Sequence, residues 1–187
     1  SWTDQYILLA QENGVPVEMD SSLFFAICKA PIIGVTGSKG KTTTASLIAH
    51  ILEHAEKKVL RVGISQVGVL GVLDQITEEH VVVFELSSWR LSALTKVKRS
   101  PHIAVVTNIF QDHLNYYKTM SAYMADKKNI FHFQKKNDIV ITDFDNVLGR
   151  EMVQDAPGSV LFTSVVGSIE GDGAWLSDET LFVSEQE

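Results

Sequence analysis

The stretch "GVTGSKGKTTT", residues 34 to 44, decides how the rest of the chain is interpreted. It follows the apolar segment 31–33 and precedes a long helical pattern, which is the strand–loop–helix context of a phosphate-binding loop. The usual pattern G-x-x-x-x-G-K-[ST] requires glycine at position 35, but that residue is Val35, and the glycines are Gly34 and Gly37. The stretch therefore predicts a phosphate loop with irregular glycine spacing.

The chemistry of this loop suits a nucleoside triphosphate. Gly37 and Gly40 can adopt backbone angles that bring main-chain N–H groups close to an anion, and the helix that follows adds its positive N-terminal end. Lys41 can reach the terminal phosphates, and the Thr42 hydroxyl is placed for Mg²⁺. The alternative is a glycine-rich turn with incidental lysines. We expect ATP and Mg²⁺ here, with ATP bound by Gly37, Ser38, Lys39, Gly40, Lys41, Thr42 and Thr43.

Composition and charge exclude several classes of protein. The 187 residues carry a net charge of −7, which disfavours a nucleic-acid-binding protein. No apolar run approaches the roughly 20 residues that span a bilayer, so we expect no membrane segment. The single cysteine, Cys28, lies in an apolar stretch and cannot form an internal disulfide, which predicts a packed thiol and a cytoplasmic protein.

Strand and helix patterns alternate along the chain, which predicts an α/β fold: a mostly parallel sheet with helices on both faces and a C-terminal hairpin. On helix 41–56 we expect Leu47, Ile48, Ile51 and Leu52 to form the buried stripe. Strands are expected at 31–37, 58–62, 81–86, 102–109, 138–143 and 159–165, helices at 3–13, 20–28, 41–56, 120–134 and 145–154, and the hairpin at 174–183.

An acidic residue stands at the end of one expected strand. Glu85 closes the apolar run 81–84, and the carboxyl ends of parallel strands face the ligand crevice in open sheets. A carboxylate there can hold Mg²⁺ against the ATP phosphates. The alternative is a strand-end carboxylate that faces solvent.

Two segments resemble a known family. Residues 36–42, which read T-G-S-K-G-K-T, resemble the loop T-G-x-x-G-K-[ST] of the Mur ligases and their folyl-polyglutamate synthetase relatives, with Lys39 where many members have Asn. Residues 85–91, which read E-L-S-S-W-R-L, resemble the E-L-S-S-F-Q-L segment of the D-glutamate-adding Mur ligases. Trp89 keeps the aromatic character of the family residue, whereas Arg90 replaces Gln.

The resemblance also implies roles for single residues. Asp112-His113-Leu114 matches the family segment D-H-L, which implies that His113 binds a second Mg²⁺, although Asn115 replaces a common Asp. Residues 63–68 align with a family G-N-I-G segment, which makes Gln66 a possible phosphate contact. Residues 123–131 resemble the helix that carries a carbamylated lysine, and the alignment selects Lys127. The implied catalytic residues are thus Lys41, His113 and Lys127.

The helix pattern supports Lys127 independently of the family. Met120, Tyr123, Ile130 and Phe131 form its apolar stripe, and Lys127 points along this stripe because it lies four residues after Tyr123. Burial lowers the pKa of a lysine, and a neutral amine can add CO₂ to give an anionic Mg²⁺ ligand. The alternative is a lysine whose stem packs on the core while its ammonium reaches water.

The resemblance implies a domain plan and a reaction. Residues 1–30 resemble the tail of an N-terminal UDP-substrate domain, and 31–187 an incomplete central ATP-binding domain without its C-terminal neighbour. The implied enzyme is a monomer that adds D-glutamate to UDP-N-acetylmuramoyl-L-alanine through an acyl phosphate in peptidoglycan precursor synthesis. The fragment alone is expected to be inactive. A folyl-polyglutamate synthetase-like ligase, a P-loop switch or transport ATPase, and a non-catalytic nucleotide-binding module stay open.

Overall fold

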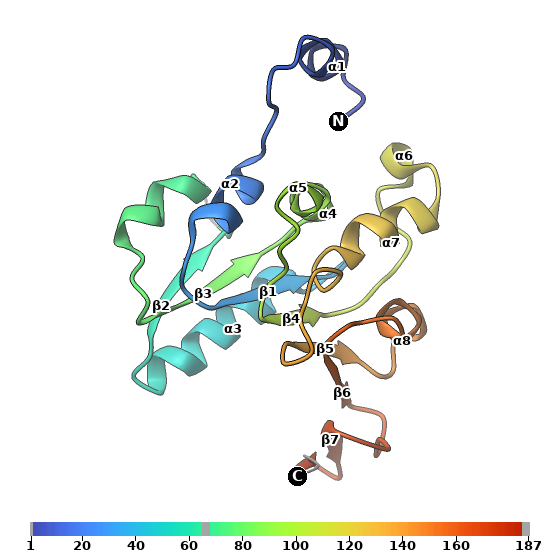
Figure 1. Cartoon of the computed structure of the whole chain (residues 1–187). Helices are drawn as coiled ribbons and strands as arrows, with labels where there is room; N and C mark the ends of the chain where they lie inside the picture. The colour runs from blue at the N-terminus through green and yellow to red at the C-terminus, as the bar shows by residue number, and fades with distance from the viewer. Residues whose placement is uncertain (1, 65–67, 185–187) are drawn as a thin grey trace.

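A single eight-stranded sheet organises the chain, whose computed structural model describes residues 2–64 and 68–184 (Figure 1). The strand order is β2-β3-β1-β4-β5-β6-β7-β8, and all neighbours are parallel except β7 and β8, which form an antiparallel hairpin. The predicted fold is confirmed. The strands are β1 (Ile32–Thr36), β2 (Lys58–Val62), β3 (His80–Glu85), β4 (Ile103–Val106), β5 (Ile139–Asp143), β6 (Ser159–Ser164), β7 (Gly173–Ser177) and β8 (Thr180–Ser184).

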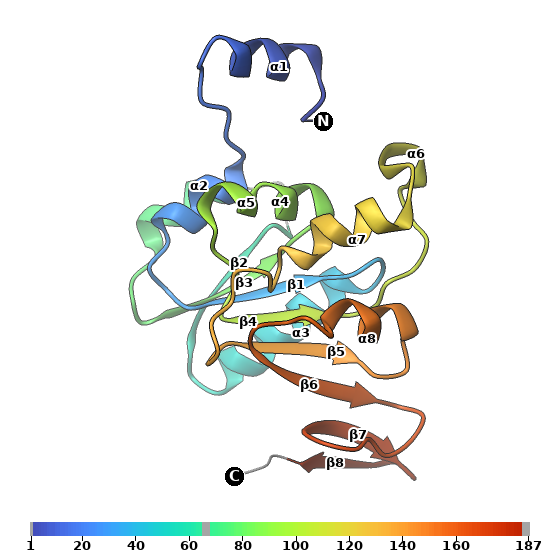
Figure 2. The ribbon, with the colours of Figure 1, turned by 45° about the vertical axis from the view of Figure 1, so that its right-hand side comes forward.

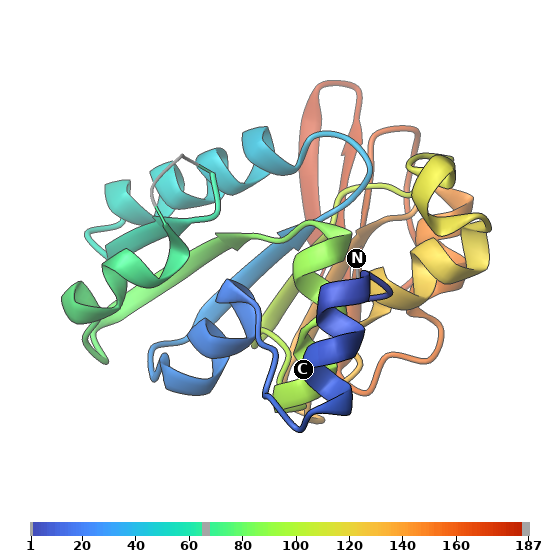
Figure 3. The ribbon, with the colours of Figure 1, turned by 90° about the horizontal axis from the view of Figure 1, so that it is seen from above.

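Helices cover the two faces of this sheet unequally (Figures 2 and 3). One face, which we call the closed face, carries α2 (Asp20–Ile27), α4 (Ser88–Ser92), α5 (Leu94–Val97), α7 (Met120–Lys128) and α8 (Val147–Val153). The other, the open face, carries α3 (Lys41–His54) over β1, β2 and β3. The short helices η1 (Val69–Gln75), α4, α5 and α6 (Leu114–Tyr117) were not predicted, because such lengths show too few turns for a periodic pattern.

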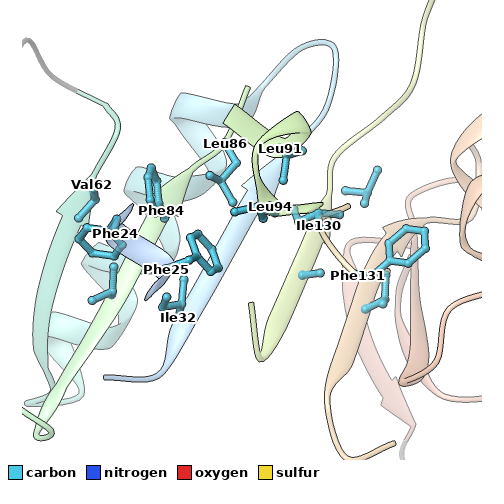
Figure 4. Close-up of a cluster of buried hydrophobic side chains, with 14 of the residues drawn as sticks. Phe24, Phe25, Ile32, Val62, Phe84, Leu86, Leu91, Leu94, Ile130 and Phe131 are labelled. Carbon is cyan, nitrogen blue, oxygen red and sulfur yellow. The ribbon is translucent and has the colours of Figure 1, made fainter. Parts of the chain in front are cut away.

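The larger hydrophobic core lies beneath the closed face (Figure 4). Phe84 of β3 is fully buried and contacts Phe24 edge-on at 5.2 Å and Phe25 in a stacked arrangement at 5.9 Å between ring centroids. Ile130 and Phe131, which follow α7, extend the same core toward β5. Helix α2 is thus fixed to the sheet by its aromatic pair.

The smaller core lies under α3, and here the sequence prediction was partly wrong. Ala45 and Ala49 face the sheet fully buried, with Ile48 beside them, whereas Leu47 and Ile51 are 56% and 58% exposed. The two alanines let α3 approach the strands closely. The predicted stripe was chosen by its large apolar side chains. The buried face of α3 is instead centred on the two alanines, so part of the predicted stripe faces solvent.

Helix α7 is shorter than the predicted helix 120–134. It ends at Lys128, and the chain then makes tight turns that place Ile130 and Phe131 in the core. The hydroxyl of Ser100 donates to the Asn129 carbonyl at 2.8 Å, which satisfies a backbone group that the helix no longer uses. Core packing therefore ends this helix before its sequence pattern does.

The N-terminal helix α1 (Gln5–Glu12) stands away from the sheet and has no buried residue (Figure 1). Trp2 contacts the rest of the molecule, because its indole N–H donates to Ser92 Oγ at 2.8 Å. Helix α2 begins at Asp20, and its N-cap is Met19, whose N–H donates to Ser22 Oγ at 3.0 Å. Cys28 is buried as expected. The domain boundary near residue 30 stays a prediction.

None of the helices in the described ranges has both the length and the apolar character that crossing a bilayer requires.

Candidate nucleotide-binding site

The crevice lies where the winding of the chain reverses. From β1 the chain crosses to the edge strand β2, whereas β4, β5 and β6 follow in order on the other side of β1. In such sheets ligands bind at the carboxyl ends of the strands beside this point. The register pairs Val35 with Glu85 and Thr36 with Val106, so the loop after β1, the end of β3 and the segment after β4 meet at one edge.

The irregular glycine spacing has a structural reason. Strand β1 continues to Thr36, so Val35 is a fully buried strand residue rather than a loop residue. Gly37 has a φ of +150°, and a Cβ there would lie 1.9 Å from the Thr107 hydroxyl. Gly40 has a φ of +80° and caps the N-terminus of α3. Both loop glycines are thus required, one by close approach and one by its backbone angle.

Lys41 folds back over the loop. Its ammonium group donates to the carbonyls of Gly37 and Ser38, both at 3.1 Å. Thr42 and Thr43 follow in the exposed first turn of α3, where N–H groups lack intrahelical partners. The loop, the lysine and the helix end thus form the arrangement that binds anions in phosphate loops.

Lys127 is buried, with 1% of its surface exposed, so the alternative in which its ammonium reaches water is wrong. The ammonium donates to Gly37 O at 2.9 Å and Thr36 Oγ1 at 3.2 Å, and lies 4.9 Å from the centre of the Tyr123 ring. Burial, and then the nearby Lys41, lower the pKa of Lys127 to about 7. A substantial fraction of this amine is therefore neutral near neutral pH.

His113 reaches the same place from the segment after β4. Its ring lies 4.8 Å from that of Trp89 and 6.1 Å from that of Tyr123, and its Nε2 is 3.7 Å from Asp112 Oδ2. Since Tyr123 also contacts Lys127, the structure brings the two predicted residues close to one aromatic ring. The Tyr123 hydroxyl lies 3.2 Å from Ser38 Oγ of the phosphate loop.

The predicted acidic ligand lies at the same edge. Glu85 ends β3 half-buried beside β1, and the N–H of Leu86 donates to Val35 O at 2.8 Å. In the described part of the chain, no group of three or more His, Cys, Asp or Glu side chains is arranged to hold a metal ion. The predicted phosphate contact Gln66 lies outside the described residues.

Thr107 and Asn108 were not predicted as site residues, because the sequence pattern places them in a strand that ends at residue 109. Strand β4 ends at Val106, and both side chains instead hydrogen-bond the phosphate loop. Thr107 Oγ1 donates to Lys39 O at 2.7 Å, and Asn108 Oδ1 accepts from the N–H of Lys39 at 2.9 Å. The signal that could have found them is a pair of polar residues directly after an apolar strand at the crevice edge.

Comparison with known protein families agrees with this geometry. Residues 35–183 match the Mur ligase middle domain. The chain belongs to the Mur ligase family. Among curated Mur ligases, the UDP-N-acetylmuramoylalanine–D-glutamate ligase of Acetivibrio thermocellus is 39% identical over 97% of this chain, and that of Roseiflexus sp. is 37% identical over 84%. The chain spans 38% and 34% of the length of these two relatives.

Solved structures of Mur ligases share the fold. MurF ligase from Thermotoga maritima, in complex with ADP, superposes with a TM-score of 0.63 at 25% identity, covering 87% of this chain and 42% of that one. MurF from Acinetobacter baumannii gives a TM-score of 0.64 at 20% identity, covering 85% and 35% of the two chains. The phosphate loop of this Mur ligase chain therefore lies within a fold that holds a nucleotide in a relative.

Proposed function

We propose that the protein to which this chain belongs joins D-glutamate to UDP-N-acetylmuramoyl-L-alanine, with ATP consumed to activate the alanyl carboxylate as an acyl phosphate. The relatives that match nearly the whole chain carry this name, and segment 85–91 separates this reading from a folyl-polyglutamate synthetase-like ligase. The phosphate loop carries the proposal. Lys41 and Lys127 of α7 both donate to the carbonyl of its Gly37, so a nucleotide bound by the loop would lie close to both lysines.

The ATP phosphates lie, in this proposal, on residues 37–43, with Lys41 exchanging its carbonyl partners for the terminal phosphates. A hollow of about 470 Å³ adjoins the loop on the open face of the sheet. It is lined by Thr44 and Ile48 of α3, by Val105 to Thr107, and by the ends of β5 and β6. Its apolar floor and polar rim suit the ribose and base of the nucleotide.

The residues at the crevice also fit Mg²⁺. The Thr42 hydroxyl in the first turn of α3 and the Glu85 carboxylate are the oxygen donors that hard cations prefer. When bound, the metal would neutralise charge on the transferred phosphate. The protein's own contribution is to hold these donors at one edge of the sheet, beside the loop that positions the phosphates.

Lys127 and His113 act, in this proposal, where the alanyl carboxylate becomes the acyl phosphate. We propose that the buried amine of Lys127 adds CO₂ and that the resulting carbamate, together with His113, holds a second Mg²⁺. Burial keeps part of this amine neutral, as carbamate formation requires. The conversion would replace a cation next to Lys41 by an anion, which relieves the repulsion between the two lysines.

The proposal includes a cytoplasmic, monomeric enzyme, with domain roles as expected for residues 1–30 and 31–187. Because the chain spans 38% of the first relative, we expect it to bind nucleotide but not to complete the ligation, since two further substrates must be held in reacting geometry.

Calorimetric titration of the 187-residue chain with Mg·ATP tests the proposal. Lys41→Ala removes a charge-assisted contact and should weaken binding by about 1.5–3 kcal/mol. Lys58→Ala is the matched control, because Lys58 pairs with Glu79 on the exposed edge of the sheet and should leave the affinity unchanged. Equal affinity in Lys41→Ala and the parent chain would refute the phosphate-loop assignment.

A further inference from the structure

We propose that Asn108 is a positioning residue for the nucleotide: its side-chain amide fixes the shape of the phosphate loop and joins this loop to the segment that carries His113. The inference rests on the proposed nucleotide site and deepens it.

Asn108 holds one residue of the loop at two points. Its Oδ1 accepts from the N–H of Lys39 at 2.9 Å, and its Nδ2 donates to the carbonyl of Lys39 at 3.1 Å. Two hydrogen bonds from one planar amide fix the orientation of Lys39 as well as its distance from Asn108. A neighbouring β-strand holds a residue by the same two backbone groups. Thr107 Oγ1 adds a second donor to the Lys39 carbonyl, at 2.7 Å.

This arrangement prepares the loop for an anion. A carbonyl oxygen that faced the phosphates would repel them, and the Lys39 carbonyl is instead directed at Thr107 and Asn108. The N–H groups of Gly40, Lys41 and Thr42, at the start of α3, have no partner within the helix. Asn108 therefore turns the acceptor of the loop away and leaves donors for the phosphates.

The segment that follows Asn108 makes further contacts with the phosphate loop and leads to His113. The N–H of Ser38 donates to Asn108 O at 2.9 Å, and the N–H of Phe110 donates to Ser38 Oγ at 2.9 Å. Asp112 and His113 follow two and three residues after Phe110, and Lys39 Nζ lies 3.9 Å from Asp112 Oδ2. A displacement of the loop is thus transmitted to the residues proposed to act on the acyl phosphate.

Asn146 provides a matched control within the same chain. It holds the neighbouring residue Ile109 by the same two groups, accepting from its N–H at 2.9 Å and donating to its carbonyl at 3.3 Å. Its Oδ1 also accepts from the N–H of Gly149 at 2.8 Å, which caps α8. Asn146 thus fixes the segment to α8, whereas Asn108 fixes it to the phosphate loop.

The experiment compares Asn108→Ala, Asn108→Asp and Asn146→Ala in the 187-residue chain. Calorimetry with Mg·ATP measures affinity, urea unfolding measures stability, and amide hydrogen exchange by NMR reports on the Lys39 N–H. Asn108→Ala should weaken Mg·ATP binding about tenfold and speed Lys39 exchange, at little cost in stability. Asn108→Asp keeps the acceptor and should retain protection of the Lys39 N–H. Asn146→Ala should lower stability with a smaller change in affinity.

Three results would overturn the proposal: unchanged affinity in Asn108→Ala, unchanged Lys39 exchange in that variant, or an equal loss of affinity in both alanine variants that follows their stability. Failure of the proposed function has a different signature. If Lys41→Ala binds Mg·ATP with the affinity of the parent, the assignment of the nucleotide site is wrong. The exchange rate of the Lys39 N–H in Asn108→Ala still decides whether Asn108 holds the loop.

Discussion

The closed and open faces of the sheet differ in how they are covered and in what they contribute to the crevice. On the closed face, the helices pack against the larger hydrophobic core, and α7 brings Lys127 to the Gly37 carbonyl of the phosphate loop. On the open face, α3 covers β1 to β3, while Leu181 and Val183 of β8 are 68% and 73% exposed. Lys41 comes from this side.

The two lysines meet at one atom, because both donate to the carbonyl of Gly37. Lys127 needs the dense core around it, since burial is what lowers its pKa. Lys41 needs the open side, where a nucleotide can enter. The crevice thus combines a lysine whose pKa is lowered by the buried closed face with a lysine on the exposed open face, where a nucleotide can enter.

The largest expected effect tests the claim that the closed face carries the stability. Phe84→Ala removes a fully buried ring that packs on Phe24 and Phe25, and should lower the free energy of unfolding by about 3–5 kcal/mol. Leu181→Ala on the open side should change it by less than about 0.5 kcal/mol. Urea unfolding of the two variants measures both values. A large loss for Leu181 would show that the hairpin is integral to the core.

A second prediction concerns the pH dependence of stability. Lys127 has a pKa of about 7 in the folded chain and an ordinary value of 10.5 when unfolded, so the unfolded chain holds more protons between these values. Stability should therefore rise with pH in this window, by about 2 kcal/mol from pH 7 to pH 9, and the penalty is fully present below pH 7. Lys127→Met should remove this rise.

The difference between parent and Lys127→Met is the decisive quantity. Burial raises the pKa of the Cys28 thiol, which gives an opposing trend at high pH that both proteins share. The unfolding curves should be recorded in buffer free of CO₂, so that no carbamate forms. If the free energy of unfolding of the two proteins depended on pH in the same way, the Lys127 amine would have its ordinary pKa. Water would then reach this amine on the closed face.

The smallest expected effect belongs to Glu85, at the edge between the two faces. Glu85→Gln keeps the shape of the side chain and removes its charge, so the Mg²⁺ concentration needed for half-maximal nucleotide binding should rise about tenfold. Calorimetry with ATP at a series of Mg²⁺ concentrations measures this. An identical Mg²⁺ series in the variant and the parent would place Glu85 outside the metal site.

The fold was predictable because the long strands and helices have strong patterns. The apolar runs at 81–84 and 102–106 and the glycine loop were enough to predict a parallel sheet with a crevice at its carboxyl edge. Helix α3 shows where a pattern misleads: sequence favours large apolar side chains, whereas the sheet selected the small Ala45 and Ala49 for close approach.

The site was predicted in part. The helical periodicity of the apolar residues around α7 predicted that Lys127 lies on the buried stripe, and the structure confirms its burial. Its partners, Thr36 and Gly37, lie 91 and 90 residues away in the chain, and no local pattern reports such a pairing. Thr107 and Asn108 were missed for the same reason, since their role depends on which loop the sheet order brings beside them.

The hydrogen bonds that shape the phosphate loop also set the order in which it can be completed during synthesis. Lys39 emerges from the ribosome 69 residues before Asn108, and Ser38 emerges 72 residues before Phe110. At roughly 5–20 residues per second, the loop waits about 3–14 s for its partners. β1 must likewise remain unpaired on both sides until β3 and β4 arrive. The strand at the centre of the finished sheet is therefore an apolar segment that stays without its neighbouring strands on the nascent chain until both have been synthesised.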